Sequence, residues 1–283
     1  MRKHDRHRHQ RGIYNARRRG SLRARRAVVA FALVSLGAWG PARAQPAATP
    51  AQAPVQGSQA RAAVADRWKE TFEAFAAEDR RQAPRPGGVL FVGSSSIRLW
   101  DSLEKDFDAL PIVTRRGFGG SRLSDCAEHV ARLVLPYDPR LVILYAGDND
   151  LAEGATPEDV LASFIVFVKA VRAKLPDTRI AYVSIKPSPL RASLIDKARD
   201  ANGLIAAYAA KQPHLDYVDV YSRMLAQDGT PRKELFAPDM LHLNRAGYAL
   251  WREEIVSRLG PVLAPSPSPE IATAARGGRR DSP

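Results

Sequence analysis

Cysteine is almost missing from this chain, since Cys126 is the only one in 283 residues. A single thiol excludes a disulfide within the chain and excludes the paired CxxC sites that bind zinc or cycle in redox reactions. The folded chain must therefore be stabilised by its hydrophobic core. Cys126 lies in a segment with helical apolar spacing, which is typical of a small buried side chain rather than of a catalytic thiol.

Several signatures of well-defined chemistries are also missing. The chain has no phosphate-binding G-x-x-x-x-G-K-[ST] loop, no zinc-binding H-E-x-x-H and no G-x-S-x-G nucleophile turn. Gly117–Gly120 begins like a dinucleotide-binding fingerprint, but Arg122 stands where the last glycine belongs. We therefore expect neither a metal ion nor an organic cofactor.

Positive charge is abundant overall but scarce outside the N-terminus. The formal net charge is +13, yet residues 1–44 hold twelve Lys or Arg and a single acid. These residues account for +11, which leaves +2 for the rest of the chain. The basicity belongs to this leader, so we expect no nucleic-acid partner for the folded part.

The leader has the plan of a secretory signal. A basic stretch precedes the apolar run Ala27–Trp39, and Ala42–Ala44 forms a small-x-small cleavage site. We expect a signal peptide over residues 1–44, cleaved after Ala44, and a periplasmic or secreted mature protein. The basic region is unusually long, which leaves an uncleaved anchor open. No later apolar run could span a membrane, so no stable membrane insertion is expected after cleavage.

Composition divides the remainder into three parts. Residues 45–60 are rich in Ala, Pro and Gln and are expected to form a linker. Residues 261–283 are rich in Pro, Ser, Gly and Arg and are expected to be a disordered tail. Residues 61–260 are then one folded domain without detectable internal repeats.

Strand-like and helix-like segments alternate along this domain. The expected strands are short, apolar runs rich in β-branched residues: Val89–Val92, Ile112–Thr114, Leu141–Ala146, Ile180–Ile185 and Tyr217–Val220. The expected helices are longer and amphipathic: Ala62–Arg81, Ser121–Leu133, Pro157–Lys174, Leu190–Lys211 and Arg245–Leu259. The strands lack polar alternation, as expected where both faces are covered. Repeated strand–helix units predict a parallel sheet between two helical layers.

Chemically useful residues follow several of these strands. Ser95 comes after the first strand, Gly120 after the second, Asn149 after the third, and His242 in the loop after the fifth. Sites in open α/β sheets form beyond the carboxyl ends of the strands, so these groups are expected to meet at one edge. A hydroxyl, an imidazole and neutral N–H donors are the parts of a serine hydrolase. The segment Lys186–Pro189 either borders this edge or simply ends the fourth strand.

The residues alone leave the choice of nucleophile open. Ser94, Ser95 and Ser96 all follow the first strand, at a turn where helix amides favour developing negative charge. Taken by itself, a serine after glycine is also ordinary turn composition. The spacing of the motif therefore indicates a candidate site without selecting its serine.

The candidate base is better defined. Only His129, His214 and His242 follow the leader, and the first two are interpreted as surface or packing residues. Asp239 lies three residues before His242 and can hold the imidazole tautomer. The alternative is an Asp-containing turn that leads into a helix capped by Asn244, which is compatible with catalysis.

Four sequence blocks together resemble the SGNH/GDSL hydrolase family, in particular the bacterial branch similar to the platelet-activating-factor acetylhydrolase catalytic subunit. The blocks are Phe91–Ser96, Arg116–Ser121, Ala146–Asp150 and Asp239–Asn244. The resemblance extends from about Arg67 to Leu259. It implies an α/β fold, a flavodoxin-like three-layer α/β/α sandwich with five parallel strands in the order 2-1-3-4-5. One departure is Ser94, which replaces the aspartate of the family's first block.

The resemblance also implies roles for individual residues. Ser95 holds the serine position of the Gly-Asp-Ser-Leu motif and is implied as the nucleophile. Asp239 and His242 are implied as the rest of the triad. Gly120 and Asn149 are implied as oxyanion donors beside the Ser95 amide.

These expectations predict an exported serine esterase that cleaves short acyl esters of small molecules or glycans through an acyl-enzyme. One alternative is a glycan O-acetyl transferase or O-acetylesterase that uses the same residues. Another is a non-catalytic carbohydrate-binding module of the cell envelope. The sequence leaves the oligomeric state open.

Overall fold

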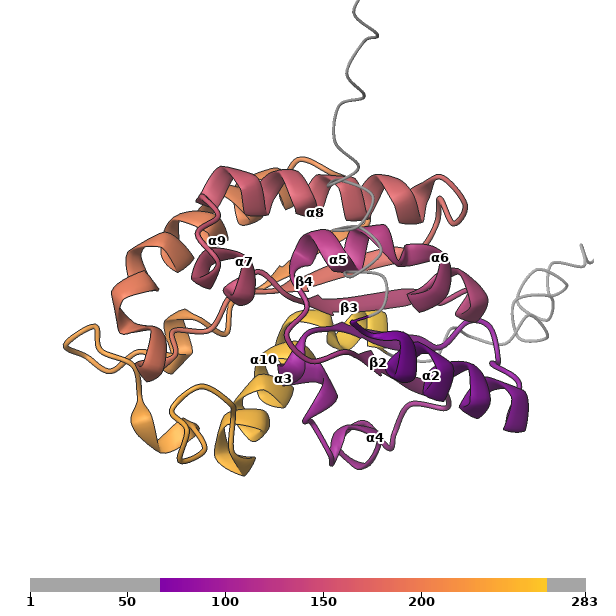
Figure 1. Cartoon of the computed structure of the whole chain (residues 1–283), viewed down its shortest axis with the longest axis horizontal. Helices are drawn as coiled ribbons and strands as arrows, with labels where there is room; N and C mark the ends of the chain where they lie inside the picture. Colours follow the sequence, from indigo (N-terminus) through magenta and orange to yellow (C-terminus); the bar gives the residue numbers. More distant parts are fainter. Residues whose placement is uncertain (1–66, 264–283) are drawn as a thin grey trace, which may run out of the picture. The chain divides into compact units, whose positions relative to one another are not determined.

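The computed structural model describes residues 67–263, and every structural statement below concerns this part of the chain. The predicted signal peptide (residues 1–44) and linker (residues 45–60) lie outside the described residues. A parallel sheet with helices on both of its faces forms three layers (Figure 1).

The sheet has five strands, all paired in parallel. They are β1 (Val89–Gly93), β2 (Val113–Gly117), β3 (Leu141–Tyr145), β4 (Arg179–Val183) and β5 (Leu215–Val218). Their order is β2-β1-β3-β4-β5, which confirms the predicted topology. The order reverses at β1, so β2 and β3 flank the strand that leads to Ser95.

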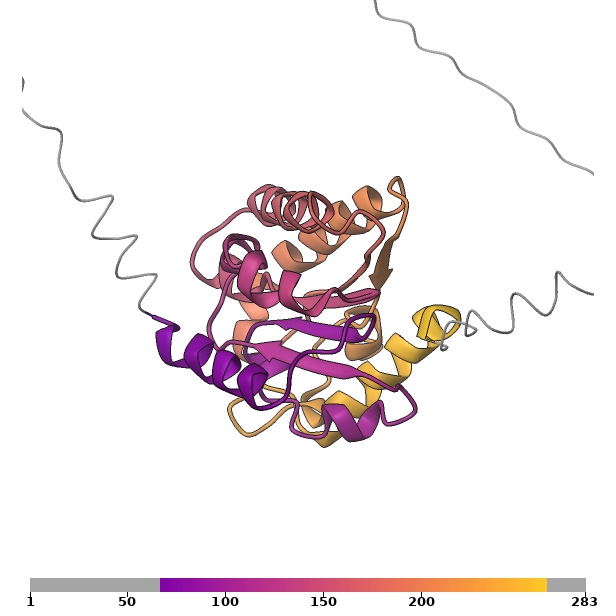
Figure 2. The same cartoon turned by 90° about the vertical axis from the view of Figure 1, so that its right-hand side faces the viewer.

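Two hydrophobic clusters hold the helices against the sheet. Leu90 and Val92 belong to one cluster with residues of α2, α5, α6, α8 and α9, while Val89 and Phe91 belong to the other cluster with residues of α3, α4 and α10. Figures 1 and 2 show α8 on one side of the sheet and α10 on the other. The first group of helices is α2 (Lys69–Arg81), α5 (Leu123–Glu128), α6 (Val130–Leu133), α8 (Pro157–Arg172) and α9 (Ile195–Ala209). The second is α3 (Ser95–Arg98), α4 (Leu103–Asp106) and α10 (Arg245–Leu263).

The remaining elements are short. Helix α7 (Asp148–Ala152) follows β3, and four 3₁₀ turns are η1 (Leu135–Tyr137), η2 (Pro189–Leu194), η3 (Ser222–Met224) and η4 (Lys233–Leu235). The sequence did not predict α3, α4 or α7, because four or five residues are too few to show helical periodicity. Two of these short helices carry residues of the candidate site.

Two predicted strands were misplaced at their ends. Strand β2 continues to Gly117 rather than stopping at Thr114, because the charged Arg116 within it is paired with acids of α2. Strand β5 spans Leu215–Val218 rather than Tyr217–Val220, and its Asp216 is ion-paired with Arg179 of β4. Ion pairing allows polar residues to occupy strand positions that hydrophobic patterning does not predict.

Two predicted helices are interrupted. The segment expected to be helical over 121–133 breaks at His129 (φ −100°, ψ 15°), which separates α5 from α6. The segment expected over 190–211 begins as the 3₁₀ turn η2, and regular helix starts only at Ile195. Capping interactions at Thr156 start α8 as predicted.

The last helix is longer than predicted and includes the first three residues of the expected tail. Helix α10 ends at Leu263, which is buried, and Arg140 donates hydrogen bonds to the carbonyls of Val262 and Leu263. These bonds satisfy carbonyls that a helix end leaves free. No helix within residues 67–263 combines the length and the apolar character needed to cross a bilayer.

Candidate active site

The turn from β1 into α3 depends on Gly93. Its φ of +150° is open to glycine, and a Cβ there would lie 1.9 Å from the carbonyl oxygen of Tyr145. The same carbonyl accepts a hydrogen bond from the Ser94 N–H at 3.0 Å. The chain thus leaves β1 in close contact with β3, and Ser95 is the first residue of α3.

The structure distinguishes the three serines of this turn. Ser94 and Ser96 are fully buried, whereas Ser95 is partly exposed. The Ser95 Oγ lies 3.0 Å from Nε2 of His242, a residue 147 positions further along the chain. Of the three hydroxyls, it is the Ser95 hydroxyl that meets the imidazole.

The Asp239 carboxylate holds the other side of the imidazole. Its Oδ2 lies 2.6 Å from His242 Nδ1, and its Oδ1 accepts hydrogen bonds from the N–H groups of Leu241 and His242 at 3.0 and 2.9 Å. The positive φ of Met240 (+56°) bends the chain into this turn. The ring hydrogen bond, followed by the two backbone bonds, lowers the pKa of Asp239 to about 2, so the carboxylate is charged at neutral pH.

The loop that carries this pair is closed by backbone pairing. Phe236 and Leu243 form an antiparallel bridge, and the Ala237 N–H donates to the His242 carbonyl at 2.8 Å. The hydroxyl of Tyr248, in α10, donates to the Ser96 carbonyl at 3.0 Å. The loop and α3 are thus tied together through the start of α10.

The candidate oxyanion donors follow the two strands beside β1. Gly120 comes after β2 with a φ of +71°, and its carbonyl accepts a hydrogen bond from Arg67 at 3.3 Å. The Trp68 indole N–H donates to the neighbouring Gly119 carbonyl at 3.0 Å. These bonds fix the glycine loop against the residues that precede α2.

Asn149 lies in the first turn of α7, after β3. Its Nδ2 donates to the Ser121 carbonyl at 2.9 Å, and its Oδ1 accepts from Arg191 Nη2 at 2.8 Å. An asparagine amide has two N–H groups, and the bond to Ser121 uses one of them. Gly147 precedes this helix with a φ of +121°, where a Cβ would lie 2.9 Å from the Ile185 side chain.

Behind Asn149 lies a buried charge cluster that the sequence did not predict. The fully buried Lys186 ammonium lies 2.8 Å from Asp148 Oδ2 and 3.0 Å from the Tyr145 hydroxyl. Arg191 Nη1 lies 3.1 Å from the same Asp148 oxygen. Of these cations, Lys186 belongs to the segment for which the sequence left two roles open, and Arg191 carried no signal beyond lying soon after a buried strand.

The pKa values of the two acids beside Asn149 shift in opposite directions. Burial alone would raise the pKa of Asp148, but the charges of Lys186 and Arg191 outweigh burial and lower it. Burial raises the pKa of Asp150 to about 6, despite two hydrogen bonds from the Leu123 N–H. Asp148 is therefore an ionised partner of cations, while Asp150 anchors the start of α5.

Cys126, His129 and His214 were not predicted to be site residues. Cys126 is buried, and burial raises the pKa of its thiol, which makes it unreactive. His129 packs against the Phe72 ring with centroids 4.8 Å apart, and His214 is exposed. Within residues 67–263, no three His, Cys, Asp or Glu side chains gather as a metal site would require.

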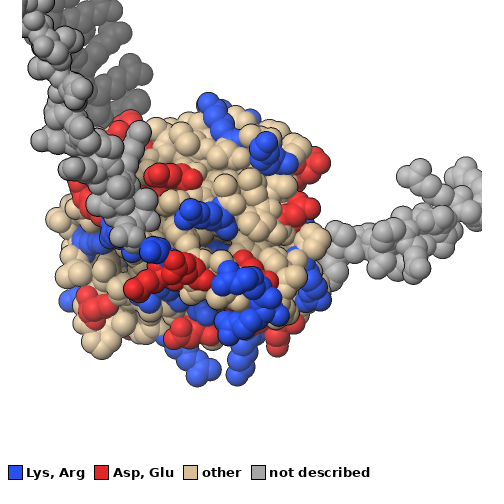
Figure 3. Space-filling model, turned by 45° about the vertical axis from the view of Figure 1, so that its right-hand side comes forward, with Lys and Arg blue, Asp and Glu red and all other residues tan. Residues whose placement is uncertain are grey.

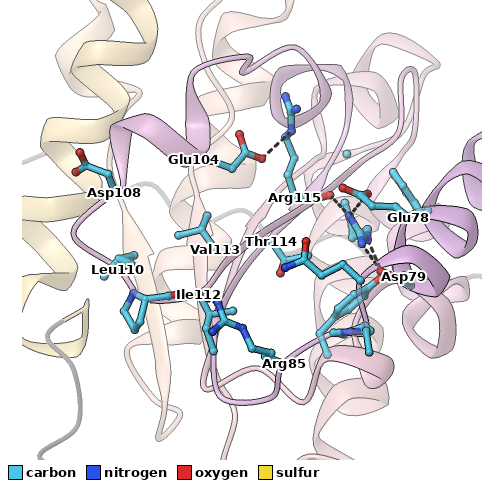
Figure 4. A pocket seen from close by; sticks show the side chains of 18 of the residues that line it. Glu78, Asp79, Arg85, Glu104, Asp108, Leu110, Ile112, Val113, Thr114 and Arg115 are labelled. Atoms are coloured by element: carbon cyan, nitrogen blue, oxygen red, sulfur yellow. Dashed lines mark hydrogen bonds and ion pairs between the residues drawn. The ribbon is translucent and has the colours of Figure 1, made fainter.

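A pocket of about 540 Å³ lies elsewhere, beside β2 and between α2 and α4 (Figure 4). It contains the ion pairs of Arg115 with Glu104 and of Arg116 with Asp79. None of the five candidate site residues lines it.

Positive and negative side chains intermix on the surface seen in Figure 3, with no extended field of one sign on that face.

The fold and the hydrogen-bonded side chains of Ser95, His242 and Asp239 together have the form of an SGNH-type hydrolase. The chain belongs to the GDSL-like lipase/acylhydrolase family, whose model matches residues 90–250. This match confirms the resemblance carried by the four sequence blocks. Among curated proteins no significantly similar sequence is found.

Solved structures share the fold at low sequence identity. A proposed platelet activating factor from Streptococcus pneumonia has a TM-score of 0.60 and 19% identity, covering 75% of this chain and 100% of that one. A GDSL-like lipase from Bacteroides thetaiotaomicron has a TM-score of 0.56 and 20% identity, covering 68% and 98%. A family 3 carbohydrate esterase from Clostridium thermocellum has a TM-score of 0.51 and 15% identity, covering 63% and 97%.

Proposed function

We propose that this member of the family is a serine esterase that hydrolyses short acyl esters through an acyl-enzyme on Ser95. The observation that carries the proposal is the continuous chain from Ser95 Oγ through the His242 ring to Asp239, with separations of 3.0 and 2.6 Å. This is the arrangement in which an imidazole can take a serine proton while a carboxylate stabilises the resulting imidazolium.

In the acylation step, the Ser95 oxygen attacks the ester carbonyl carbon, and its proton passes to His242 Nε2. The carbonyl π electrons move to oxygen and form a tetrahedral oxyanion. When the oxyanion collapses, the bond to the alcohol oxygen breaks, and His242 returns the proton to that oxygen. The alcohol leaves, and the acyl group remains on Ser95.

In the deacylation step, water takes the place of the alcohol. His242 accepts a proton from the water as its oxygen attacks the acyl carbon, and the proton then returns to the Ser95 oxygen as the acid leaves. Asp239 stays ionised throughout, because its pKa of about 2 lies far below neutral pH. Its role is to hold the ring with Nδ1 protonated and Nε2 free to accept.

The oxyanion in both steps would be met by three N–H donors. They are the backbone amides of Ser95 and Gly120 and the second amide N–H of Asn149. The Ser95 amide belongs to the first turn of α3, and the other two residues follow the strands on either side of β1. Preorganised donors of this kind are worth more than donors in water because they need no reorientation during the reaction.

The exposure of the site favours small acyl groups. The side chain of Asp239 is 48% exposed and that of His242 is 25% exposed, so the triad lies at the surface rather than in a deep tunnel. We propose short acyl esters of small molecules or of glycans as the substrate class. We further propose that the reaction takes place outside the cytoplasm, on the basis of the signal-like residues 1–44.

The test is hydrolysis of p-nitrophenyl acetate by three serine variants. Ser95→Ala is expected to lower kcat/KM by at least about 10³-fold, with circular dichroism unchanged. The matched controls Ser94→Ala and Ser96→Ala, in the same turn, are expected to keep activity within about threefold of the wild type. Loss of less than about tenfold in Ser95→Ala would contradict the proposal.

A further inference from the structure

A cluster of three charges, two of them on buried side chains, contacts the candidate oxyanion donor Asn149. The cluster consists of Asp148 from α7, Lys186 from the segment after β4 and Arg191 from η2. Asp148 Oδ2 is shared, at 2.8 Å from Lys186 Nζ and 3.1 Å from Arg191 Nη1. The segments that follow β3 and β4 are thus joined at one carboxylate oxygen.

The cluster carries one more positive than negative charge. The Lys186 side chain is fully buried and the Asp148 side chain is 6% exposed, so neither can be solvated by bulk water. Buried charges are costly unless they are paired, and Lys186 and Asp148 already neutralise one another. The Arg191 guanidinium, at 21% exposure, is therefore the additional cation of the cluster.

This additional cation contacts the candidate active site. While Arg191 Nη1 faces Asp148, Arg191 Nη2 donates to Asn149 Oδ1 at 2.8 Å. On its other side, Asn149 Nδ2 donates to the Ser121 carbonyl at 2.9 Å. If the amide were turned over, its oxygen would face the Ser121 carbonyl and its NH₂ would face the guanidinium, and both contacts would be repulsive.

Building on the proposed function, we propose that Arg191, paired with Asp148, is a positioning residue that fixes and polarises the Asn149 amide for oxyanion binding. Arg191 does not touch the substrate in this account. Its contact admits only the orientation of the Asn149 amide in which Nδ2 donates to the Ser121 carbonyl. A guanidinium bound to the amide oxygen also draws electrons from the amide nitrogen, which makes the second N–H a stronger donor.

The donor that Arg191 positions acts in the transition state. Negative charge develops on the carbonyl oxygen of the ester only in the tetrahedral state, and the polarised Asn149 N–H stabilises that state more than the neutral ester. Interactions that are made only in the transition state raise kcat and kcat/KM together and leave KM unchanged. The inference therefore predicts a kinetic pattern that a purely structural arginine would not give.

The experiment is a double-mutant cycle on the full chain with p-nitrophenyl acetate. Asn149→Ala alone is expected to lower kcat by roughly 10²–10³-fold through loss of one donor. Arg191→Met in the wild-type background is expected to lower kcat and kcat/KM by about tenfold or more, and by less than about twofold in the Asn149→Ala background. The matched control Arg199→Met, in the exposed first half of α9, is expected to leave both constants unchanged.

Folding is checked separately for each variant by thermal unfolding. If Arg191→Met is unfolded at the assay temperature, Arg191→Lys takes its place in the cycle, because the ammonium keeps a positive charge beside Asp148. A lysine cannot hold Asp148 and Asn149 at once as the guanidinium fork does, so the same dependence on Asn149 is expected.

Two results would overturn the inference. One is an equal loss from the arginine substitution in both backgrounds, which would mean that Arg191 acts independently of Asn149. The other is a rise in KM at constant kcat, which would mean that Arg191 binds the ester directly. Failure of the proposed function looks different, since Ser95→Ala and Asn149→Ala would then keep wild-type activity.

Discussion

Positive-φ residues bring the candidate site residues of this protein to the carboxyl edge of the sheet. Gly93 turns β1 into α3 and presents Ser95, Gly147 turns β3 into α7 and presents Asn149, and Met240 bends the loop between Asp239 and His242. Met240 is the only one of the three turning residues that carries a side chain. Here the positive φ allows one carboxylate to bind two backbone N–H groups and the imidazole at the same time.

Asp150 gives a pH-dependent prediction at the scale of one residue. Its pKa is raised by burial to about 6, from an ordinary carboxyl value near 4. Between these two values the native state binds more protons than the unfolded state, so this group's contribution to stability falls as pH rises from about 4 to 6. Above that window its ionised form is a constant cost.

The measurement is urea unfolding of the wild type and Asp150→Asn at several pH values. Asparagine can still accept the hydrogen bond from the Leu123 N–H, but it does not titrate. The variant is expected to gain about 1–3 kcal/mol relative to the wild type as pH rises from about 4 to 7. A difference that stays constant over this range would contradict the assigned pKa.

Some residues of the candidate site can be predicted from the sequence, and others cannot. Ser95, Asp239 and His242 were predicted from motif spacing and family register, and the structure brings them into one bonded chain. Their catalytic roles stay predictions. Arg191 could not be predicted, because it lies 42 residues from Asn149 in an irregular turn, and only the packing of η2 against α7 joins the two.

At the scale of elements, β2 and α2 form a unit joined through one buried arginine. The Arg116 side chain is 5% exposed and binds Glu78, Asp79 and the Tyr137 hydroxyl. Its neighbour Arg115 points to the other side of the strand. These paired charges explain why apolar patterning ended β2 three residues too early, since hydrophobic periodicity carries no information about ion pairs.

The two neighbouring arginines make a matched pair for a stability prediction. Arg116→Met is expected to cost about 2–4 kcal/mol of unfolding free energy, because it leaves Asp79 partly buried without its cation. Arg115→Met is expected to cost about 1 kcal/mol or less, because its acidic partners Asp101 and Glu104 are 94% and 52% exposed.

Urea unfolding at neutral pH measures both effects. Folded samples of either variant are expected to hydrolyse p-nitrophenyl acetate at the same rate as the wild type, since neither arginine contacts Ser95, His242 or Asp239. Equal costs for the two substitutions would contradict the account of α2 docking given above. A larger cost for Arg115→Met would do so even more strongly.

At the scale of the whole molecule, strand order decides which residues meet. The alternation of buried strands and amphipathic helices was enough to predict the parallel sheet, and the family resemblance added the order 2-1-3-4-5. Because β1 lies inside the sheet, the loops after β2 and β3 border Ser95 on both sides. The irregular loop after β5 then closes back over this edge with His242.

The measurement that tests the central claim most directly is covalent labelling with a fluorophosphonate, followed by peptide mapping of the modified residue. The wild type is expected to carry one phosphonyl group, on Ser95, while Ser95→Ala carries none and His242→Ala reacts at least about 10³-fold more slowly. A label on another residue, or undiminished labelling of Ser95→Ala, would contradict the account.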